Sequence, residues 1–180
     1  MDPLARIGES APDFVLPDLE GRLCRLADER GRIVVLNYWS AECPHSERTD
    51  QILSSLRPAW RGRVTVWWLA SNANEPDELL KLIAHQRQIG PVLLDVGQVI
   101  ADRYGAQTTP QVFVVDAAGV LRYSGATDDV GFRQRVPTRR FLADAVQALL
   151  EGRAPEPETT APFGCALVRM RGVPGPLVNP

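Results

Sequence analysis

The sequence predicts an α/β protein with a central mixed β-sheet flanked by helices. Two observations support this fold class. Apolar, β-branched runs of strand length alternate along the chain with segments in which apolar residues recur every three or four positions. In addition, 180 residues with 44% hydrophobic content are enough for one domain with an ordinary core.

The first half of the chain is expected to open with a hairpin, because a turn signal at residues 18–21 joins two short strand-like runs. The run at Ile33–Tyr38 is continuously apolar, as in a strand buried on both faces. The expected elements are strands at Phe14–Leu16, Arg22–Leu26 and Ile33–Tyr38, a helix at Pro44–Trp60 and a strand at Val64–Ala70.

The second half continues the alternation and ends in a tail. The expected elements are helices at Pro76–Arg87, Gln98–Tyr104 and Thr138–Glu151, a strand at Val92–Leu94, and a hairpin of Gln111–Val115 with Val120–Tyr123. Residues 1–152 are therefore predicted to form the domain, and residues 153–180 a proline-rich tail that carries Cys165. Within the tail, Phe163–Val168 is apolar enough to dock on the domain.

Charge and composition exclude several classes of partner. The net charge is -2, so no basic excess favours nucleic acid or an anionic membrane. The apolar runs are too short for a transmembrane helix. Residues 1–14 lack an apolar leader, which leads us to expect a cytoplasmic protein, or a periplasmic or extracytoplasmic one if the amino terminus has been trimmed. The oligomeric state stays open.

Cys43 is the strongest candidate for a reactive residue. It lies between a buried strand and the start of a helix, where free backbone N–H groups and the helix dipole stabilise a thiolate. A protonated His45 would add a favourable charge, whereas Glu42 opposes the thiolate. The competing interpretation is a buried, inert cysteine. Cys24 suits that interpretation, because its strand-like surroundings suggest a small buried apolar residue.

Four motifs resemble those of a known family. The segment Asn37–Ser46 resembles the active-site turn of thioredoxin-like proteins, and Thr108–Asp116 resembles their cis-proline loop. With the Tyr-x-Gly-x-x-Asp-Asp stretch at residues 123–129 and the late Gly-Cys at residues 164–165, the chain is similar to the peroxiredoxin-like redoxins of the AhpC/TSA superfamily. The resemblance implies a thioredoxin fold with an amino-terminal hairpin, a cis bond before Pro110, and substrate contacts from Trp39, Thr109 and Pro110.

The chain also departs from its relatives. Ser46 replaces the second cysteine of the Cys-x-x-Cys turn, so a resolving thiol must come from elsewhere, and Cys165 is the candidate. The alternative is that the Cys165 segment only caps the domain. Ser40 stands three residues before Cys43, as in peroxiredoxins, but Leu36 occupies the position of their proline. Their peroxide-holding arginine cannot be assigned; Arg103, Arg122 and Arg133 are candidates.

These observations favour a thiol-disulfide oxidoreductase, with Cys43, Cys165, His45, Ser46 and Ser40 as catalytic residues. One alternative is a peroxiredoxin-like hydroperoxide reductase, and another is a non-catalytic module that binds client proteins. Either chemistry needs no bound cofactor. It needs a protein disulfide or hydroperoxide as substrate and an external reductant, either a thioredoxin-like protein or a low-molecular-weight thiol. We expect no metal, although Cys43 with His45 resembles a soft-metal pair such as copper(I) prefers.

Overall fold

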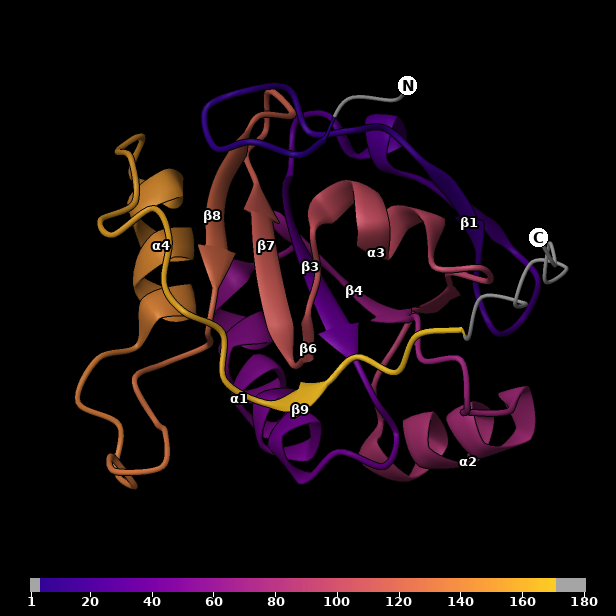
Figure 1. Ribbon diagram of the computed structural model, residues 1–180. Coiled ribbons are helices and arrows are strands. Elements are labelled where there is room, and N and C mark those ends of the chain that lie inside the picture. Colours follow the sequence, from indigo (N-terminus) through magenta and orange to yellow (C-terminus); the bar gives the residue numbers. More distant parts are fainter. Residues whose placement is uncertain (1–3, 171–180) are drawn as a thin grey trace, which may run out of the picture.

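The computed structural model of the protein describes residues 4–170 and is built around one five-stranded sheet. The strand order is β5-β4-β3-β7-β8, with β3, β4 and β5 parallel and with β7 antiparallel to both β3 and β8 (Figure 1). The strands are β3 (Ile33–Trp39), β4 (Val64–Ala70), β5 (Val92–Leu94), β7 (Gln111–Val115) and β8 (Leu121–Gly125). This is the thioredoxin fold that the sequence predicts.

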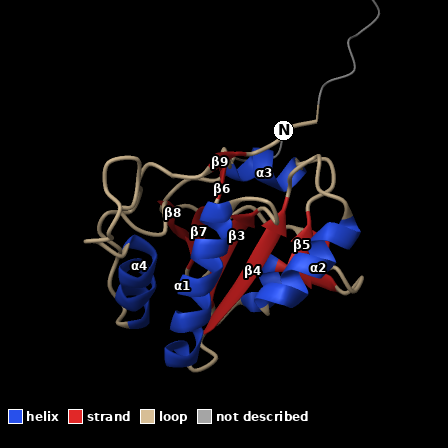
Figure 2. Ribbon diagram, turned by 90° about the horizontal axis from the view of Figure 1, so that it is seen from below, coloured by secondary structure: helices blue, strands red, loops and turns tan. Residues whose placement is uncertain are grey.

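Helices cover both faces of the sheet, as Figure 2 shows. Successive side chains of β3 alternate between two buried clusters, with Val35 and Trp39 on one face and Leu36 and Tyr38 on the other. The first face packs against α1 (Pro44–Trp60), α2 (Asp77–Arg87) and α4 (Phe141–Leu150). The second packs against α3 (Val99–Tyr104) and the amino-terminal segment with β1 (Val15–Pro17), β2 (Leu23–Arg25) and the 3-10 helix η1 (Leu26–Glu29).

Most predicted elements are present, and the largest shift in a boundary is at α4. This helix begins at Phe141 rather than at Thr138. Asp129 accepts hydrogen bonds from the backbone N–H and the hydroxyl of Thr138. These bonds hold Thr138 in the loop that precedes the helix, so the helix starts one turn later. At α2, Pro76 precedes the helix as its N-cap instead of lying in the first turn.

The tail docks on the domain along the edge where β3 ends. Strand β9 (Cys165–Ala166) pairs antiparallel with β6 (Thr108–Thr109), and the yellow segment in Figure 1 follows this path past β6. Leu167 is buried in the second cluster, and its N–H donates to Gln107 O at 2.9 Å. Residues 171–180 of the predicted tail lie outside the described residues.

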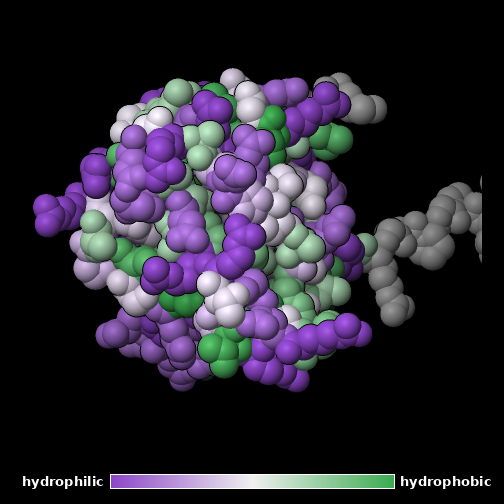
Figure 3. Space-filling model, turned by 90° about the vertical axis from the view of Figure 1, so that its left-hand side faces the viewer, coloured by the Kyte–Doolittle hydropathy of each residue, from purple (hydrophilic) through white to green (hydrophobic). Residues whose placement is uncertain are grey.

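The surface over α4 is largely hydrophilic, with apolar residues in small separate patches (Figure 3). No helix in residues 4–170 has the length and apolar character needed to cross a bilayer.

Candidate active site

Cys43 occupies the N-cap of α1, directly after the turn that follows β3. Its backbone is extended, Pro44 fills the first helical position, and the side chain is almost fully buried. The Cys43 thiol donates to the carbonyl oxygen of Thr109 at 3.1 Å. The nucleophile candidate therefore lies between a helix start and the loop that carries Pro110.

Cys165 lies beside Cys43, because pairing of β9 with β6 places Cys165 opposite Thr109. Burial alone would raise the pKa of Cys43. Hydrogen bonds from the Cys165 side chain and from the backbone N–H groups of Ser46, Cys165 and His45 outweigh burial and lower that pKa below its ordinary value. Burial and the hydrogen bond to Cys43 together raise the pKa of Cys165 to about 11. The pair is thus polarised, because the pKa of Cys43 is lowered and that of Cys165 is raised.

His45 and Ser46 act on Cys43 through their backbone N–H groups. The imidazole ring of His45 packs edge-on against Phe163 of the tail, with ring centroids 4.9 Å apart. The Ser46 hydroxyl is buried and accepts a hydrogen bond from the Ser40 N–H at 3.2 Å. The groups through which these two residues contact Cys43 are therefore the peptide N–H groups of the helix start.

Glu75 is a site residue that the sequence did not reveal. It lies on the loop between β4 and α2 and is largely buried. Its carboxylate accepts hydrogen bonds from the Ser40 hydroxyl at 2.8 Å and from the Glu42 N–H at 3.1 Å, and so fixes the turn before Cys43. The Ser40 hydroxyl, expected to hold peroxide, is therefore engaged in positioning the turn. No local motif marks Glu75: its bond from the Asn72 amide at 3.0 Å is local, but its partners at the Cys43 turn lie more than 30 residues away.

A second buried carboxylate, Asp50, holds the floor of the site together. It accepts hydrogen bonds from the indole N–H groups of Trp39 and Trp68, at 2.9 and 2.7 Å, and pairs with Arg87 at 3.0 Å. Arg87 also donates to the Ala41 carbonyl, which ties α2 to the turn before Cys43. Trp39 is fully buried, so its expected substrate contact is wrong: it supports the site from the core.

The Thr109–Pro110 bond is cis, as the resemblance implied. Thr109 is fully buried, and its hydroxyl is one of few buried polar atoms without a hydrogen-bond partner in the described part of the chain. Its carbonyl receives the Cys43 thiol, and its backbone pairs with the tail. Thr109 therefore lies at the site, in contact with both cysteines, and Pro110 follows it beside Gly164 of the tail.

The remaining candidates lie apart from this site. Cys24 is half-buried against the second core cluster, and burial raises its pKa. Arg122 pairs with Asp116, Arg103 donates to Asp13 O, and neither they nor Arg133 line the cavity at Cys43. Within residues 4–170, no group of three or more His, Cys, Asp or Glu side chains is placed to hold a metal ion.

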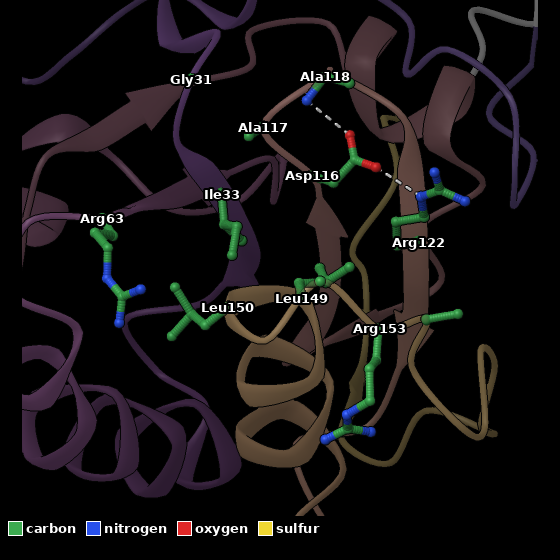
Figure 4. A pocket seen from close by; sticks show the side chains of 12 residues that line it. Gly31, Ile33, Arg63, Asp116, Ala117, Ala118, Arg122, Leu149, Leu150 and Arg153 are labelled. Atoms are coloured by element: carbon green, nitrogen blue, oxygen red, sulfur yellow. Dashed lines mark hydrogen bonds and ion pairs between the residues drawn. The ribbon is translucent and has the colours of Figure 1, made fainter.

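Two cavities flank opposite ends of β3. The one at Cys43 has a volume of about 160 Å³, and its lining consists of Ser40, Glu42, Cys43, Asn72, Asn74, Thr109, Cys165, Ala166 and Val168. A larger cavity of about 490 Å³ lies where β3 begins, between Ile33, Leu149 and Leu150, with arginines around it (Figure 4). It contains no cysteine or histidine, and its carboxylate, Asp116, is already bonded to Arg122 and to the Ala118 N–H. Of these two cavities, only the smaller one is lined by cysteines.

Comparison with known proteins assigns the fold to a family. The AhpC/TSA family matches residues 7–124, which span the hairpin, the Cys43 turn, the cis-proline loop and β8. The chain belongs to the AhpC/TSA family. It is a redoxin of the thioredoxin-like superfamily.

Within the thioredoxin-like redoxins, one similar protein is the thiol-disulfide oxidoreductase ResA of Geobacillus thermodenitrificans. It is 35% identical over 117 residues, which cover 64% of this chain and 67% of the relative. This relative favours thiol-disulfide exchange among the functions that the sequence left open. The chain spans about two thirds of the length of such ResA relatives.

Two solved structures match almost the whole chain. A hypothetical protein of Sinorhizobium meliloti has a TM-score of 0.83 and 28% identity, covering 95% of this chain and 98% of its own. An uncharacterized conserved protein of Geobacillus kaustophilus has a TM-score of 0.80 and 26% identity, covering 96% of each chain. Because so little is left uncovered, the likeness extends beyond the family match and into the tail.

The expected cytoplasmic location is wrong. The likeness to the ResA thiol-disulfide oxidoreductases contradicts it. A further neighbour in fold, with a TM-score of 0.53 and 22% identity, is an exposed lipoprotein thioredoxin of Streptococcus pneumoniae. The polar character of residues 1–14 is therefore a poor guide to the compartment.

Proposed function

We propose that this redoxin is a thiol-disulfide oxidoreductase in which Cys43 is the nucleophile and Cys165 the resolving thiol. The observation that carries the proposal is that both cysteines line one cavity, with Cys43 bonded to the Thr109 carbonyl and Cys165 paired with Thr109. The lowered pKa of Cys43 and the raised pKa of Cys165 agree with it. Thiolate is the attacking species in disulfide exchange, so the lowered pKa selects Cys43 for the first step.

In the first step, the Cys43 thiolate attacks one sulfur of a substrate disulfide. The substrate S–S bond breaks, a Cys43 mixed disulfide forms, and the released thiolate takes up a proton. Cys165 then loses its proton and attacks Cys43 Sγ, which expels the second substrate thiol and leaves a Cys43–Cys165 disulfide. The substrate has gained two electrons and two protons, and an external thiol reductant restores both protein thiols.

The polarity of the pair also orders these steps. The thiolate of Cys43 contributes to the high pKa of Cys165 through charge and through the hydrogen bond. Once Cys43 enters a mixed disulfide its negative charge is gone, so the pKa of Cys165 falls when its proton has to leave. Cys165 is thus held protonated until a substrate is attached.

The two alternatives are less well supported. Peroxide reduction would need a free hydroxyl at Ser40, which donates to Glu75, and a proline where the buried Leu36 stands. Client binding without turnover would need an open edge at the cis-proline loop, and β9 occupies that edge.

Turnover with 2-hydroxyethyl disulfide tests the proposal, with glutathione as reductant and glutathione reductase with NADPH to report its oxidation. The wild type and Cys24→Ser should both accelerate NADPH consumption. Cys43→Ser should give only the background rate, and Cys165→Ser should accumulate a mixed disulfide at Cys43. Equal turnover by wild type and Cys43→Ser would refute the proposal. Acceleration by hydrogen peroxide, but not by the disulfide, would favour the peroxidase instead.

A further inference from the structure

The tail occupies the backbone edge beside Cys43. Thr109, whose carbonyl receives the Cys43 thiol, is paired with Cys165, and Thr108 is paired with Ala166. An extended peptide that sought to add a strand at this edge would need the same backbone groups. The protein's own tail therefore fills the place of a client strand.

The fit of the tail depends on a glycine. A Cβ built on Gly164 would lie 2.3 Å from Thr109 O and 2.9 Å from Pro110 Cδ. These distances are far inside van der Waals contact, so only glycine lets the tail approach the cis-proline loop this closely. Thr109 and Pro110 thus receive the tail through shape as well as through hydrogen bonds.

The tail is fastened on the other side of Cys165 too. Leu167 is buried, and the Val168 carbonyl accepts a hydrogen bond from the Gln98 side chain at 2.7 Å. The Val168 N–H donates to Asn72 Oδ1 at 2.8 Å. Lifting the tail would break these bonds and expose Leu167, so the edge is closed in most molecules.

The opening that remains is the cavity of about 160 Å³ between the tail, the Cys43 turn and the loop that carries Asn72 and Asn74. It is smaller than the pockets of about 300–1,000 Å³ that hold drug-sized ligands. Glu42 is the one charged side chain that lines it among the described residues, and no basic side chain does. Buried Glu75 lies next to it, on Ser40 and the Glu42 N–H. The cavity is thus lined largely by apolar atoms, and the charged side chains in and beside it are acidic.

We propose that the substrate is a small uncharged or cationic disulfide that enters this cavity, and that the docked tail excludes peptide disulfides from Cys43. This inference rests on the proposed function and narrows it. The Asn74 side chain lines the cavity and offers hydrogen bonds to a polar substituent of the substrate. The carboxylates disfavour an anionic substituent.

The first step is measured with three small disulfides of similar length: cystamine, 2-hydroxyethyl disulfide and 3,3′-dithiodipropionate. Quenched-flow trapping of Cys43 gives the rate of its reaction with each disulfide. Each rate is then divided by the rate at which free 2-mercaptoethanol reacts with the same disulfide. We expect the anionic disulfide to react about tenfold more slowly than the other two, from repulsion at short range. Glu42→Gln should narrow this gap. An anionic disulfide as fast as the cationic one would overturn the charge assignment.

A neutral pentapeptide disulfide tests exclusion by the tail. In the wild type it should react about 100-fold more slowly than 2-hydroxyethyl disulfide, as for an edge open in about one molecule in a hundred. Gly164→Ala should raise the ratio of peptide to small-disulfide rates at least about tenfold by disfavouring the docked tail. Gly131→Ala is the matched control, since a Cβ there meets nothing within 4 Å. Leu167→Ala loosens the same segment independently.

The outcomes separate the two proposals. If the wild type reacts with none of the disulfides, the proposed function fails and this inference falls with it. If the wild type reacts equally fast with the peptide and the small disulfides, the inference is overturned while the proposed function stands. If Gly164→Ala and Leu167→Ala leave the rate ratio at the wild-type value, exclusion by the tail is overturned.

Discussion

The two ends of β3 differ in what they offer a ligand. At the end that leads to Cys43, the cavity is small, but backbone N–H groups and two thiols converge on it. At the end that begins with Ile33, the cavity is about three times larger, and the Asp116 carboxylate there is already satisfied by Arg122 and two backbone N–H groups. The convergence of polar groups, rather than the volume of the cavity, therefore distinguishes the end of β3 that is suited to catalysis.

Topology explains why the ends differ. Strands β3 and β4 are parallel, so both end on the side where Cys43 and Asn72 lie. The start of α1 adds its free N–H groups at the same place. In open α/β sheets this side collects ligands because helix starts and strand ends meet there. The opposite side receives helix ends and turns, and the arginines around the larger cavity serve mainly as local ion pairs.

Loss of the nucleophile should be the largest effect and should separate the two ends. Cys43→Ser is expected to lower the rate of disulfide exchange at least about 1,000-fold, because a hydroxyl is not ionised at neutral pH. Arg122→Gln and Arg153→Gln, at the larger cavity, should stay within about twofold of the wild type. Stopped-flow measurement of thiol release decides this. An arginine variant as inactive as Cys43→Ser would move the chemistry to the other end.

The free energy of unfolding should depend more strongly on Asp50, at the Cys43 end of β3, than on Asp116, at the opposite end. Asp50→Ala breaks a buried ion pair and leaves two indole N–H groups without an acceptor, which should lower the free energy of unfolding by about 3–5 kcal/mol. Asp116→Ala removes a turn carboxylate and a partly exposed ion pair and should cost about 1–2 kcal/mol. Urea unfolding monitored by tryptophan fluorescence gives both values. Equal losses would show that the floor of the site is no more tightly held than the far turn.

The pH dependence of alkylation should distinguish Cys43 from Cys165. Cys43, whose pKa is lowered, should react with iodoacetamide at a lower pH than a free thiol, and Cys165 should follow only near pH 11. In Cys43→Ser, the thiolate that raises the pKa of Cys165 is gone, so Cys165 should react at lower pH than in the wild type. Peptide mapping after a short pulse measures each site. A Cys165 profile unaffected by Cys43→Ser would contradict the polarised pair.

His45→Ala should have the smallest effect. The His45 contribution to the pKa of Cys43 comes from its backbone N–H, which alanine retains. The alkylation rate of Cys43 at pH 7 should therefore stay within about twofold of the wild type. Glu75→Gln is compared with His45→Ala, because glutamine keeps an acceptor for the Ser40 hydroxyl while it removes the carboxylate near the turn. A large drop in rate for His45→Ala would restore the imidazole as the main stabiliser of the thiolate.

Much of the fold was predictable because its signals are local. The continuous apolar run predicts β3, and the regular spacing of apolar residues predicts α1, so each signal lies within the element itself. Cys43 was predictable for the same reason, since a strand followed by Cys-Pro marks a helix start. The start of α4 could not be predicted in this way, because Asp129, nine residues before Thr138, holds Thr138 in the loop.

The rest of the site depends on contacts between distant segments. Glu75 contacts the Cys43 turn from the loop before α2, and Arg87 contacts it from α2 itself. No spacing in the sequence encodes those contacts. Trp39 was misplaced because a tryptophan beside an active-site turn resembles a substrate contact, whereas its indole faces Asp50 in the core. The Cys165 segment was predicted to dock, but its pairing with Thr109 depends on the close approach at Gly164.

Resolution of Cys43 by Cys165 is the central step of the proposed reaction, and its product can be identified in a single turnover. The reduced protein is mixed with one equivalent of 2-hydroxyethyl disulfide, quenched with acid, and mapped by mass spectrometry of its peptides. The polarised pair predicts a disulfide joining the Cys43 and Cys165 peptides, with Cys24 free and no adduct left on Cys43. A stable 2-hydroxyethyl adduct on Cys43, with Cys165 still a free thiol, would contradict it.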